Sequence, residues 1–214
     1  PHLMIDGRVV VLETMEGGAL VDINSSGFYV KAHGKILGGA FTGDLEAWGK
    51  DLNSSPSLYA SLSLSPSIIN SVQSQLTQWM EQQGAQSAKE IEKLKKGINS
   101  GNAVIDQIGA GTLDIIKTMS TETATLGVLV SKNMIPSIKE ITFKGNLDKS
   151  GANMRFGIQV QLGNQVMDPV YVDINLKGDL QSQLSQIADI LKKQILAEFE
   201  DLGKGVIQQA QELG

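Results

Sequence analysis

Between residues 8 and 64, apolar and polar side chains alternate with a period of two, which is typical of β-strands with one buried face. Residues 9–15 and 19–24 flank Glu16-Gly17-Gly18 and are expected to form a hairpin. Further strands are expected at residues 28–33, 36–48 and 57–64, with turns at residues 24–27 and 34–35. In the last strand Tyr59, Ser61 and Ser63 share the polar side. The pattern therefore predicts a sheet with one face in water.

After residue 65 the pattern changes to that of helices. One apolar stripe, which Pro66 opens, contains Ile68, Ile69, Val72, Leu76, Trp79 and Met80, and Gly84 is expected to end or interrupt this helix. A second stripe from Ile91 to Met119 has apolar residues three and four apart, which predicts one long helix. Four glycines in it cost about 1 kcal/mol each. They either break the helix or let another element pack against its backbone. Residues 121–132 fit a strand or a third helix.

The strand pattern returns at Ile138, and residues 154–162 alternate more regularly than any others in the chain. Turns are expected at residues 148–151 and 163–164, followed by a closing strand at residues 169–176. Asp179 is expected to cap a final helix, which Gly203 and Gly205 separate from a short terminal one. The apolar stripe of that helix contains Leu180, Leu184, Ile187, Leu191, Ile195 and Phe199.

The two junctions between strand and helix resemble each other. Residues 56–64 and 169–176 each begin with proline and carry one outward tyrosine, and each leads into a helix that contains Gln-Ser-Gln-Leu. This similarity indicates an internal duplication, although a chain rich in Ser and Gln can produce it by coincidence.

The sequence therefore predicts an α+β fold in which antiparallel β-meanders pack against long amphipathic helices, in the order strands, helix, strands, helix. Residues 1–4 are interpreted as a tag or cloning remnant, and residues 5–214 as a single domain. Within that domain we expect a first meander and helix at 5–84, a long helical insert at 85–136, and a second meander and helix at 137–214.

Composition narrows the function. The net charge of −5 over 214 residues argues against nucleic-acid binding, which needs a dense cationic surface. The chain has no cysteine, which excludes disulfides, thiolate metal sites and cysteine nucleophiles. The chain contains no run of about 18 apolar residues, so no transmembrane segment is predicted. These features fix no compartment, and an extracellular or cell-surface location is favoured. The oligomeric state stays open.

Few residues offer chemistry. His33 is the one histidine outside residues 1–4, and no Gly-x-Ser-x-Gly sequence supplies a nucleophile. Asp44 and Glu46 lie on one strand face, and Asp168 and Asp173 bracket another strand, but no calcium-loop or phosphate-loop sequence is present. We therefore expect no enzyme, no cofactor and no metal site. A carboxylate or histidine enzyme that uses Asp44, Glu46 or His33 is the third hypothesis.

Two functional hypotheses lead. The first is a non-enzymatic interaction or structural module, a segment of a larger surface or secreted protein, with a protein partner. The second is a carrier of lipid or another apolar ligand, because a curved sheet with long apolar helices resembles the layout of tubular lipid-binding domains. That resemblance rests on architecture and implies a groove between sheet and helices. The residues predicted to line it are Trp48, Trp79, Ile98, Gly101, Ile105, Ile108 and Phe156.

Overall fold

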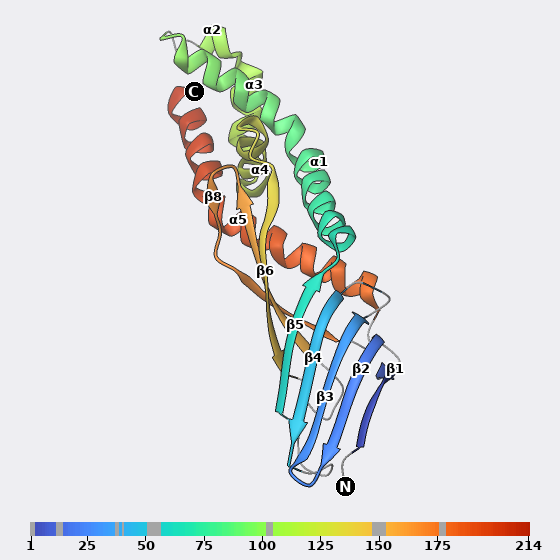
Figure 1. The fold of residues 1–214 in the computed structure, drawn as a ribbon. Coiled ribbons are helices and arrows are strands. Elements are labelled where there is room, and N and C mark those ends of the chain that lie inside the picture. The colour runs from blue at the N-terminus through green and yellow to red at the C-terminus, as the bar shows by residue number, and fades with distance from the viewer. Residues whose placement is uncertain are drawn as a thin grey trace. The chain divides into compact units, whose positions relative to one another are not determined.

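Antiparallel sheets and long helices follow one another along the chain, as the computed structural model shows (Figure 1). The structure describes residues 3–11, 15–36, 39, 41–50, 57–101, 105–146, 153–175 and 179–214. Among the described residues, five strands precede the first long helix, and four more lie between the group of helices that it begins and the last long helix. The predicted α+β class and the order strands, helix, strands, helix are therefore confirmed.

The first sheet is an antiparallel meander in which neighbours in sequence are neighbours in space. Its strands are β1 (Leu3–Val11), β2 (Met15–Asn24), β3 (Gly27–Ile36), β4 (Phe41–Gly49) and β5 (Ser57–Leu64). The turn before β3 and the strand at residues 57–64 are confirmed. Leu3 and Met4 lie in β1, and their assignment to a tag stays a prediction.

Two predicted turns of this sheet are wrong. Gly17 and Gly18 lie inside β2, and Gly34 lies inside β3. The register pairs Gly17 with Gly34 and Gly34 with Gly43, so glycines of three neighbouring strands stand side by side in the ladder. In this chain glycine therefore occurs both in turns and in a row of paired positions across three strands. The local sequence does not distinguish these two situations.

The second sheet has β7 (Asn153–Leu162) at its centre. β6 (Pro136–Asn146) pairs with one edge of β7, while the other edge pairs with β8 (Gln165–Val166) and β9 (Val170–Asn175). The predicted turn at residues 163–164 is present, with Gly163 at φ 58°. The predicted turn at residues 148–151 lies outside the described residues. The closing strand predicted for residues 169–176 is β9.

Two helices of 34 residues each, α1 (Pro66–Asn99) and α5 (Leu180–Leu213), follow the two sheets. α1 continues through Gly84, and α5 continues through Gly203 and Gly205, so the predicted interruptions are wrong. The single long helix predicted from Ile91 to Met119 is also wrong. The chain leaves α1 at its end and forms α2 (Ile105–Ile108) and α3 (Ala110–Thr118) instead.

Glycine explains these breaks. Gly101 has φ 74° and Gly109 has φ 86°, a conformation that disfavours any residue with a Cβ atom. Residues 121–132, which fit a strand or a third helix by sequence, contain the helix α4 (Thr121–Ser131). Ser120 caps this helix by accepting a hydrogen bond from the Thr123 amide at 3.1 Å.

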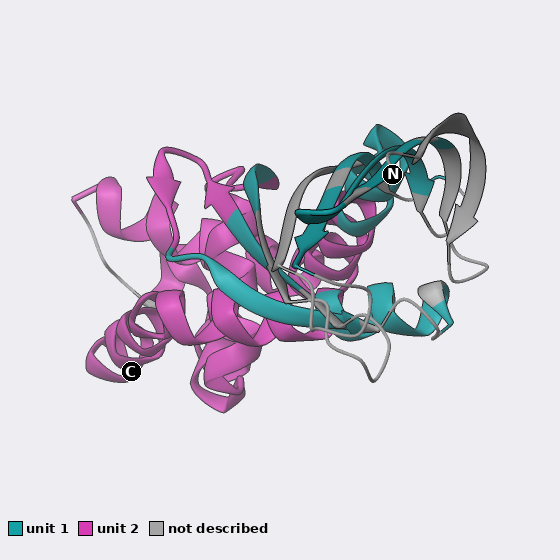
Figure 2. Cartoon of the chain, turned by 60° about the horizontal axis from the view of Figure 1, so that its bottom comes forward, with its two compact units in different colours: residues 1–72, 138–159, 168–187 teal, residues 73–137, 160–167, 188–214 magenta. Residues whose placement is uncertain are grey.

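Contacts divide the chain into two compact units, shown in two colours in Figure 2. Unit 1 comprises residues 1–72, 138–159 and 168–187, and unit 2 comprises residues 73–137, 160–167 and 188–214. The residues of α1, β7 and α5 are shared between the units. The predicted single domain with three consecutive parts stays a prediction.

The core of unit 1 combines strand and helix side chains. Phe156, Ile158, Val172 and Ile174 of β7 and β9 are buried, as are Val72, Leu184 and Ile187 of the helices. Arg155, Tyr171 and Asp173 of the same strands are exposed. The alternation predicted for residues 154–162 and 169–176 is therefore confirmed at the side chains that the structure describes.

Unit 2 is built around α4, of which every residue from Ala124 to Leu129 is buried. A Cβ atom on Gly84 of α1 would lie 2.8 Å from the carbonyl oxygen of Leu126. A Cβ atom on Gly203 of α5 would lie 2.5 Å from the carbonyl oxygen of Thr121. Both long helices therefore approach the backbone of α4 through glycine, which is why these glycines interrupt neither helix.

Candidate functional site

The first sheet places six polar and aromatic side chains on one side of two neighbouring strands. Side chains alternate along a strand, and residues paired across an antiparallel ladder lie on the same side. The register pairs Tyr29 with Trp48, Lys31 with Glu46, and His33 with Asp44. We call this set of six residues the outer face.

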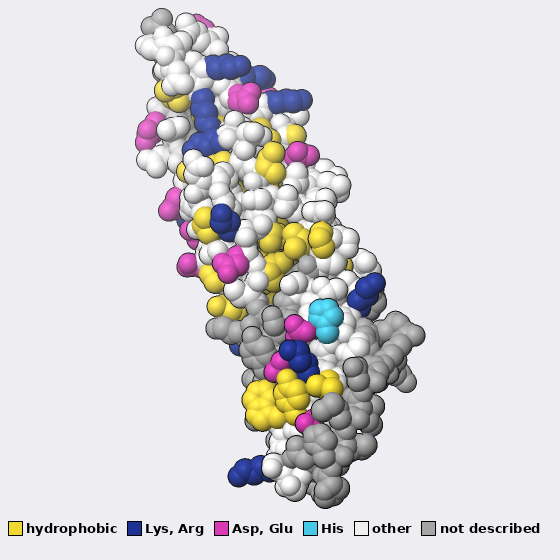
Figure 3. All heavy atoms as spheres, viewed as in Figure 1, with side chains coloured by type: hydrophobic (Ala, Val, Ile, Leu, Met, Phe, Trp, Pro, Cys, Tyr) yellow, Lys and Arg dark blue, Asp and Glu magenta, His cyan; other side chains and the backbone are white. Residues whose placement is uncertain are grey.

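The other side of the same strands carries apolar residues. Val30 and Ala32 of β3 alternate with the outer face, and Ala47 of β4 is the register partner of Val30. Ala32 is buried, whereas Lys31, His33 and Trp48 are exposed. Figure 3 shows acidic, basic and hydrophobic side chains close together beside a histidine on the surface drawn there. At the described side chains of β3 and β4, the exposed residues therefore lie on one side, as alternation predicts, while Val30 and Ala47 on the other side are half-buried.

Ion pairs join two rows of the outer face. Lys31 Nζ lies 3.0 Å from Glu46 Oε1, and His33 Nδ1 lies 2.8 Å from Asp44 Oδ1. The hydrogen bond from Lys31 to Glu46 raises the pKa of the Lys31 ammonium, and the negative charge of Glu46 adds to the effect. Exposed pairs of this kind contribute about 0–1 kcal/mol to stability, so they orient side chains more than they hold the sheet together.

The third row is aromatic. Tyr29 is half-buried and Trp48 is 43% exposed. Desolvation raises the pKa of the Tyr29 hydroxyl, and the charge and hydrogen bond of Glu46 raise it further. Glu46 thus accepts hydrogen bonds from both Tyr29 and Lys31, which links the aromatic row to the ion pair beside it.

The pair His33–Asp44 has the geometry of the acid–base half of a catalytic triad, in which histidine stands between an acid and a nucleophile. In this sheet Asp44 stands in the middle instead. Its other neighbour in register is Ser61 of β5, while the other neighbour of His33 is Gly18 of β2. Among the paired positions of the sheet, the serine is therefore beside the acid, and the histidine has glycine where a nucleophile would be needed.

The carboxylates of the outer face also lack the arrangement of a glycosidase or a metal site. Asp44 and Glu46 are two residues apart on one strand and are paired with His33 and Lys31, whereas glycosidase acids face each other across a cleft. Among the residues that the structure describes, no three His, Asp or Glu side chains group together as metal ligands. The outer face offers hydrogen-bond donors, acceptors and an aromatic surface.

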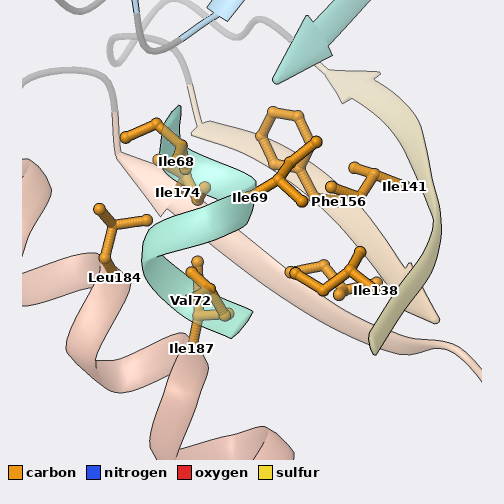
Figure 4. Close-up of a pocket in the computed structure, with 10 residues that line it drawn as sticks. Ile68, Ile69, Val72, Ile138, Ile141, Phe156, Ile174, Leu184 and Ile187 are labelled. Atoms are coloured by element: carbon orange, nitrogen blue, oxygen red, sulfur yellow. The ribbon is translucent and has the colours of Figure 1, made fainter. Parts of the chain in front are cut away.

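Unit 1 also contains an apolar pocket. Figure 4 shows its side chains converging from α1, α5 and the second sheet. The lining residues are Ile68, Ile69, Val72, Ile138, Ile141, Phe156, Ile158, Ile174, Leu184 and Ile187. The cavity volume is about 10 Å³, close to the least space that holds one water molecule. These side chains fill the pocket almost completely.

Two residues predicted to line a groove lie in unit 1, at different places. Trp48 belongs to the outer face of β4, and Phe156 is buried in the apolar pocket. Trp48 and Phe156 therefore belong to two separate features of the unit, and a ligand role for either stays a prediction.

The other predicted ligand residues lie in unit 2. Ile108 is buried in the helical core cluster and Ile98 packs against that cluster. Gly101 is exposed just after α1, and the side chain of Ile105 lies outside the described residues. Trp79 is half-buried, with Lys192 Nζ 5.9 Å from its ring centre. Ile98 and Ile108 therefore contribute to a packed core, and a ligand role for these five stays a prediction.

Tyr29 and Lys31 are the residues of the outer face that sequence reasoning missed. They follow the same alternation as His33, and Trp48 follows the alternation of Asp44 and Glu46. The available signal was this shared spacing of two on neighbouring strands. The turn predicted at residues 34–35 is incompatible with the register of β3 and β4, and that register brings the residues of the two strands together.

The helices that the structure describes include none long and apolar enough to cross a membrane. Comparison of the chain with protein-family models, with curated proteins and with solved structures finds no match in any of the three.

Proposed function

We propose that this chain is a non-enzymatic interaction module and that the outer face is its binding surface. The observation that carries the proposal is the register that sets an exposed Trp48 and its neighbour Tyr29 beside two ion pairs on one sheet face. Tryptophan and tyrosine provide much contact area for little loss of conformational freedom, and they dominate many binding surfaces.

The order of residues on the face supports binding over catalysis. A reaction needs a nucleophile or a general base that reaches the substrate, whereas Asp44 lies between His33 and the one serine in register with it. Both carboxylates are already engaged, Glu46 with Lys31 and Asp44 with His33. Paired, oriented side chains of this kind recognise a ligand without changing it.

Site-specific photo-crosslinking tests the proposal. A diazirine-bearing residue is placed at His33, whose side chain is 73% exposed, and in a second protein at Gln208, which is exposed on α5. Both proteins are illuminated in cells of the source organism, and adducts are identified by mass. We expect an adduct at position 33 that disappears when Trp48→Ala is added, and no such adduct at position 208. Equal labelling at both positions, or an adduct that Trp48→Ala leaves intact, contradicts the proposal.

A carrier of lipid or another apolar ligand is the second candidate, and the wholly apolar lining of the pocket in unit 1 favours it. Because the cavity volume is about 10 Å³, an alkyl chain enters only if the helices and the sheet separate. Native mass spectrometry of protein purified from cells separates the candidates. An interaction module gives the mass of the polypeptide alone, and a carrier gives that mass plus a bound lipid.

The proposal also places the module within a larger surface or secreted protein. The two similar strand-to-helix junctions and the scarcity of side chains for chemistry motivate it. The parent gene tests this part directly. A long reading frame with a signal sequence and repeated segments supports it, and a short frame that encodes a free-standing protein contradicts it.

A further inference from the structure

We infer that the outer face takes an uncharged carbohydrate chain, an inference that rests on the proposed function and names its ligand class. The contacts that lead to it are the aromatic row, the two ion pairs beside it, and the spacing of the three rows along the strands.

The aromatic row supplies the apolar part of the site. One face of a sugar ring presents C–H groups with a small positive charge, and the face of an indole or phenol ring carries negative charge. Trp48 exposes 43% of its surface, and the register places Tyr29 directly opposite. The flat rings of the paired Trp48 and Tyr29 suit the flat face of a sugar ring.

The ion pairs supply the polar part. A sugar hydroxyl both donates and accepts a hydrogen bond, so it needs acceptors and donors close together. Glu46 and Asp44 can accept hydrogen bonds from a hydroxyl, and Lys31 can donate one. Lys31 lies 3.0 Å from Glu46, and His33 lies 2.8 Å from Asp44. Because each of these side chains is already oriented by its partner, less side-chain entropy is lost when a hydroxyl binds.

The charges on this side of the sheet disfavour an acidic ligand. The positive charge of Lys31 is balanced by Glu46, and Asp44 adds a negative charge that His33 balances only when protonated. Asp22 of β2, the register partner of Tyr29, adds another carboxylate on the same side of the sheet. A phosphate backbone or an acidic chain would meet two carboxylates on this face, and binding of nucleic acid depends on the opposite arrangement.

A protein partner fits the face less well. The centre of a protein interface is depleted of charged residues, with aromatic and apolar side chains in the middle and polar ones at the rim. Here the middle row is the ion pair of Lys31 and Glu46, and the aromatic row stands at one end. Because residues rise about 3.4 Å each, the three rows extend over about 14 Å, which suits a short oligosaccharide better than a single sugar.

Affinity electrophoresis tests the inference on the full chain. The protein migrates through gels that contain a soluble β-glucan, a xylan or a galactomannan, and through gels with heparin or polygalacturonate as charged comparisons. We expect retardation by at least one uncharged polysaccharide, and the same retardation at low and high salt, because no ion pair with the ligand forms. Calorimetry with oligosaccharides of the retarding type then gives the affinity.

Variants locate the site. Trp48→Ala is expected to weaken binding at least tenfold, and Glu46→Gln, which keeps the side-chain shape, about fivefold. Tyr171→Ala is the matched control. Tyr171 is 42% exposed, much as Trp48 is, but it belongs to β9 of the second sheet, where its ring lies beside Gly157. It should bind as the unchanged protein does. Circular dichroism of each variant checks the fold, and Glu46→Gln decides the result if Trp48→Ala unfolds.

The outcomes separate this inference from the proposed function. Retardation only by charged polysaccharides, or retardation abolished by salt, overturns the carbohydrate assignment. Unchanged binding by Trp48→Ala and Glu46→Gln overturns the location. If no uncharged polysaccharide binds, the inference falls, while a protease-sensitive adduct at position 33 in the crosslinking experiment would still support an interaction module.

Discussion

Gly203 of α5 lies so close to Thr121 of α4 that a Cβ atom at position 203 would stand 2.5 Å from the carbonyl oxygen of Thr121. The same Cβ atom would lie 2.7 Å from the backbone nitrogen of Thr125. Backbone atoms within a buried helix cannot turn aside as the end of a long side chain can. The hydrogen side chain of glycine therefore sets the distance between α5 and α4.

Gly203→Ala should lower the free energy of unfolding by about 1–3 kcal/mol, because the added methyl group forces the two helices apart in a packed core. The matched control is Gly205→Ala on the same helix, where an added Cβ atom meets nothing within 4 Å. That change should be neutral or stabilise by up to about 1 kcal/mol through helix propensity. Urea denaturation measures both, and equal effects would contradict the close packing.

The behaviour of these glycines shows where sequence reasoning reaches its limit. Gly101 and Gly109 break helices at positive φ, whereas Gly84 and Gly203 sit inside helices against α4. All four are glycines in a helical apolar pattern, and the close contacts of Gly84 and Gly203 are with residues 42 and 82 positions away, Leu126 and Thr121. Strand and helix periods could therefore be read from local spacing, but the continuity of the two 34-residue helices could not.

Thr112→Val should destabilise the protein by about 1–2 kcal/mol. Thr112 of α3 donates a hydrogen bond of 2.9 Å to Glu90 Oε2 of α1, and both side chains are buried. Valine keeps the shape of threonine but removes the donor, so one oxygen of a buried carboxylate loses a partner. Thr118→Val is the control, because Thr118 is exposed and bonds only to backbone oxygens of its own helix. A similar loss in both variants would assign the effect to the helix and not to Glu90.

Acid should weaken the fold partly through Glu90. The hydrogen bonds from Lys93 and Thr112 lower the pKa of this carboxyl below its ordinary value of 4.5, although burial opposes them. The unfolded chain then binds the proton more tightly than the folded one. The stabilisation is fully present above the ordinary value and is lost as the pH falls through the lower pKa of the folded state. Urea denaturation from about pH 3 to about pH 7 should show a shallower acid loss for Glu90→Gln; an unchanged slope contradicts this role.

The cap that the sequence predicts for the last helix offers a direct check. Asp179 Oδ2 accepts a hydrogen bond of 2.8 Å from the amide of Ser182 in the first turn of α5. Asp179→Ala should cost about 0.5–2 kcal/mol in the free energy of unfolding, and Asp179→Asn should keep most of it. Thermal or urea denaturation of the two variants measures the difference. Equal losses would mean that the charge, and not the hydrogen bond, stabilises the helix.

The candidate site was only half accessible from the sequence. Alternation placed Asp44 and Glu46 on one strand face and His33 on another strand, and both placements hold. What brings them together is the register of β3 and β4, which depends on the loop between them. Because the sequence predicts a turn at Gly34, it places His33 at the end of a strand, whereas the register sets His33 opposite Asp44. A single wrongly predicted turn is therefore enough to hide a surface formed by residues of two strands.

Removal of the ion pairs on the outer face should leave the stability of the protein almost unchanged. The side chains of His33 and Asp44 are 73% and 43% exposed, and exposed pairs contribute about 0–1 kcal/mol. His33→Ala and Asp44→Asn should each alter the free energy of unfolding by less than about 0.5 kcal/mol, as surface substitutions commonly do. Urea denaturation checks this, with Gly203→Ala as the destabilised reference. A loss above about 2 kcal/mol would show that the pair supports the sheet. A small loss allows any fall in ligand binding by the same variants to be assigned to the face itself.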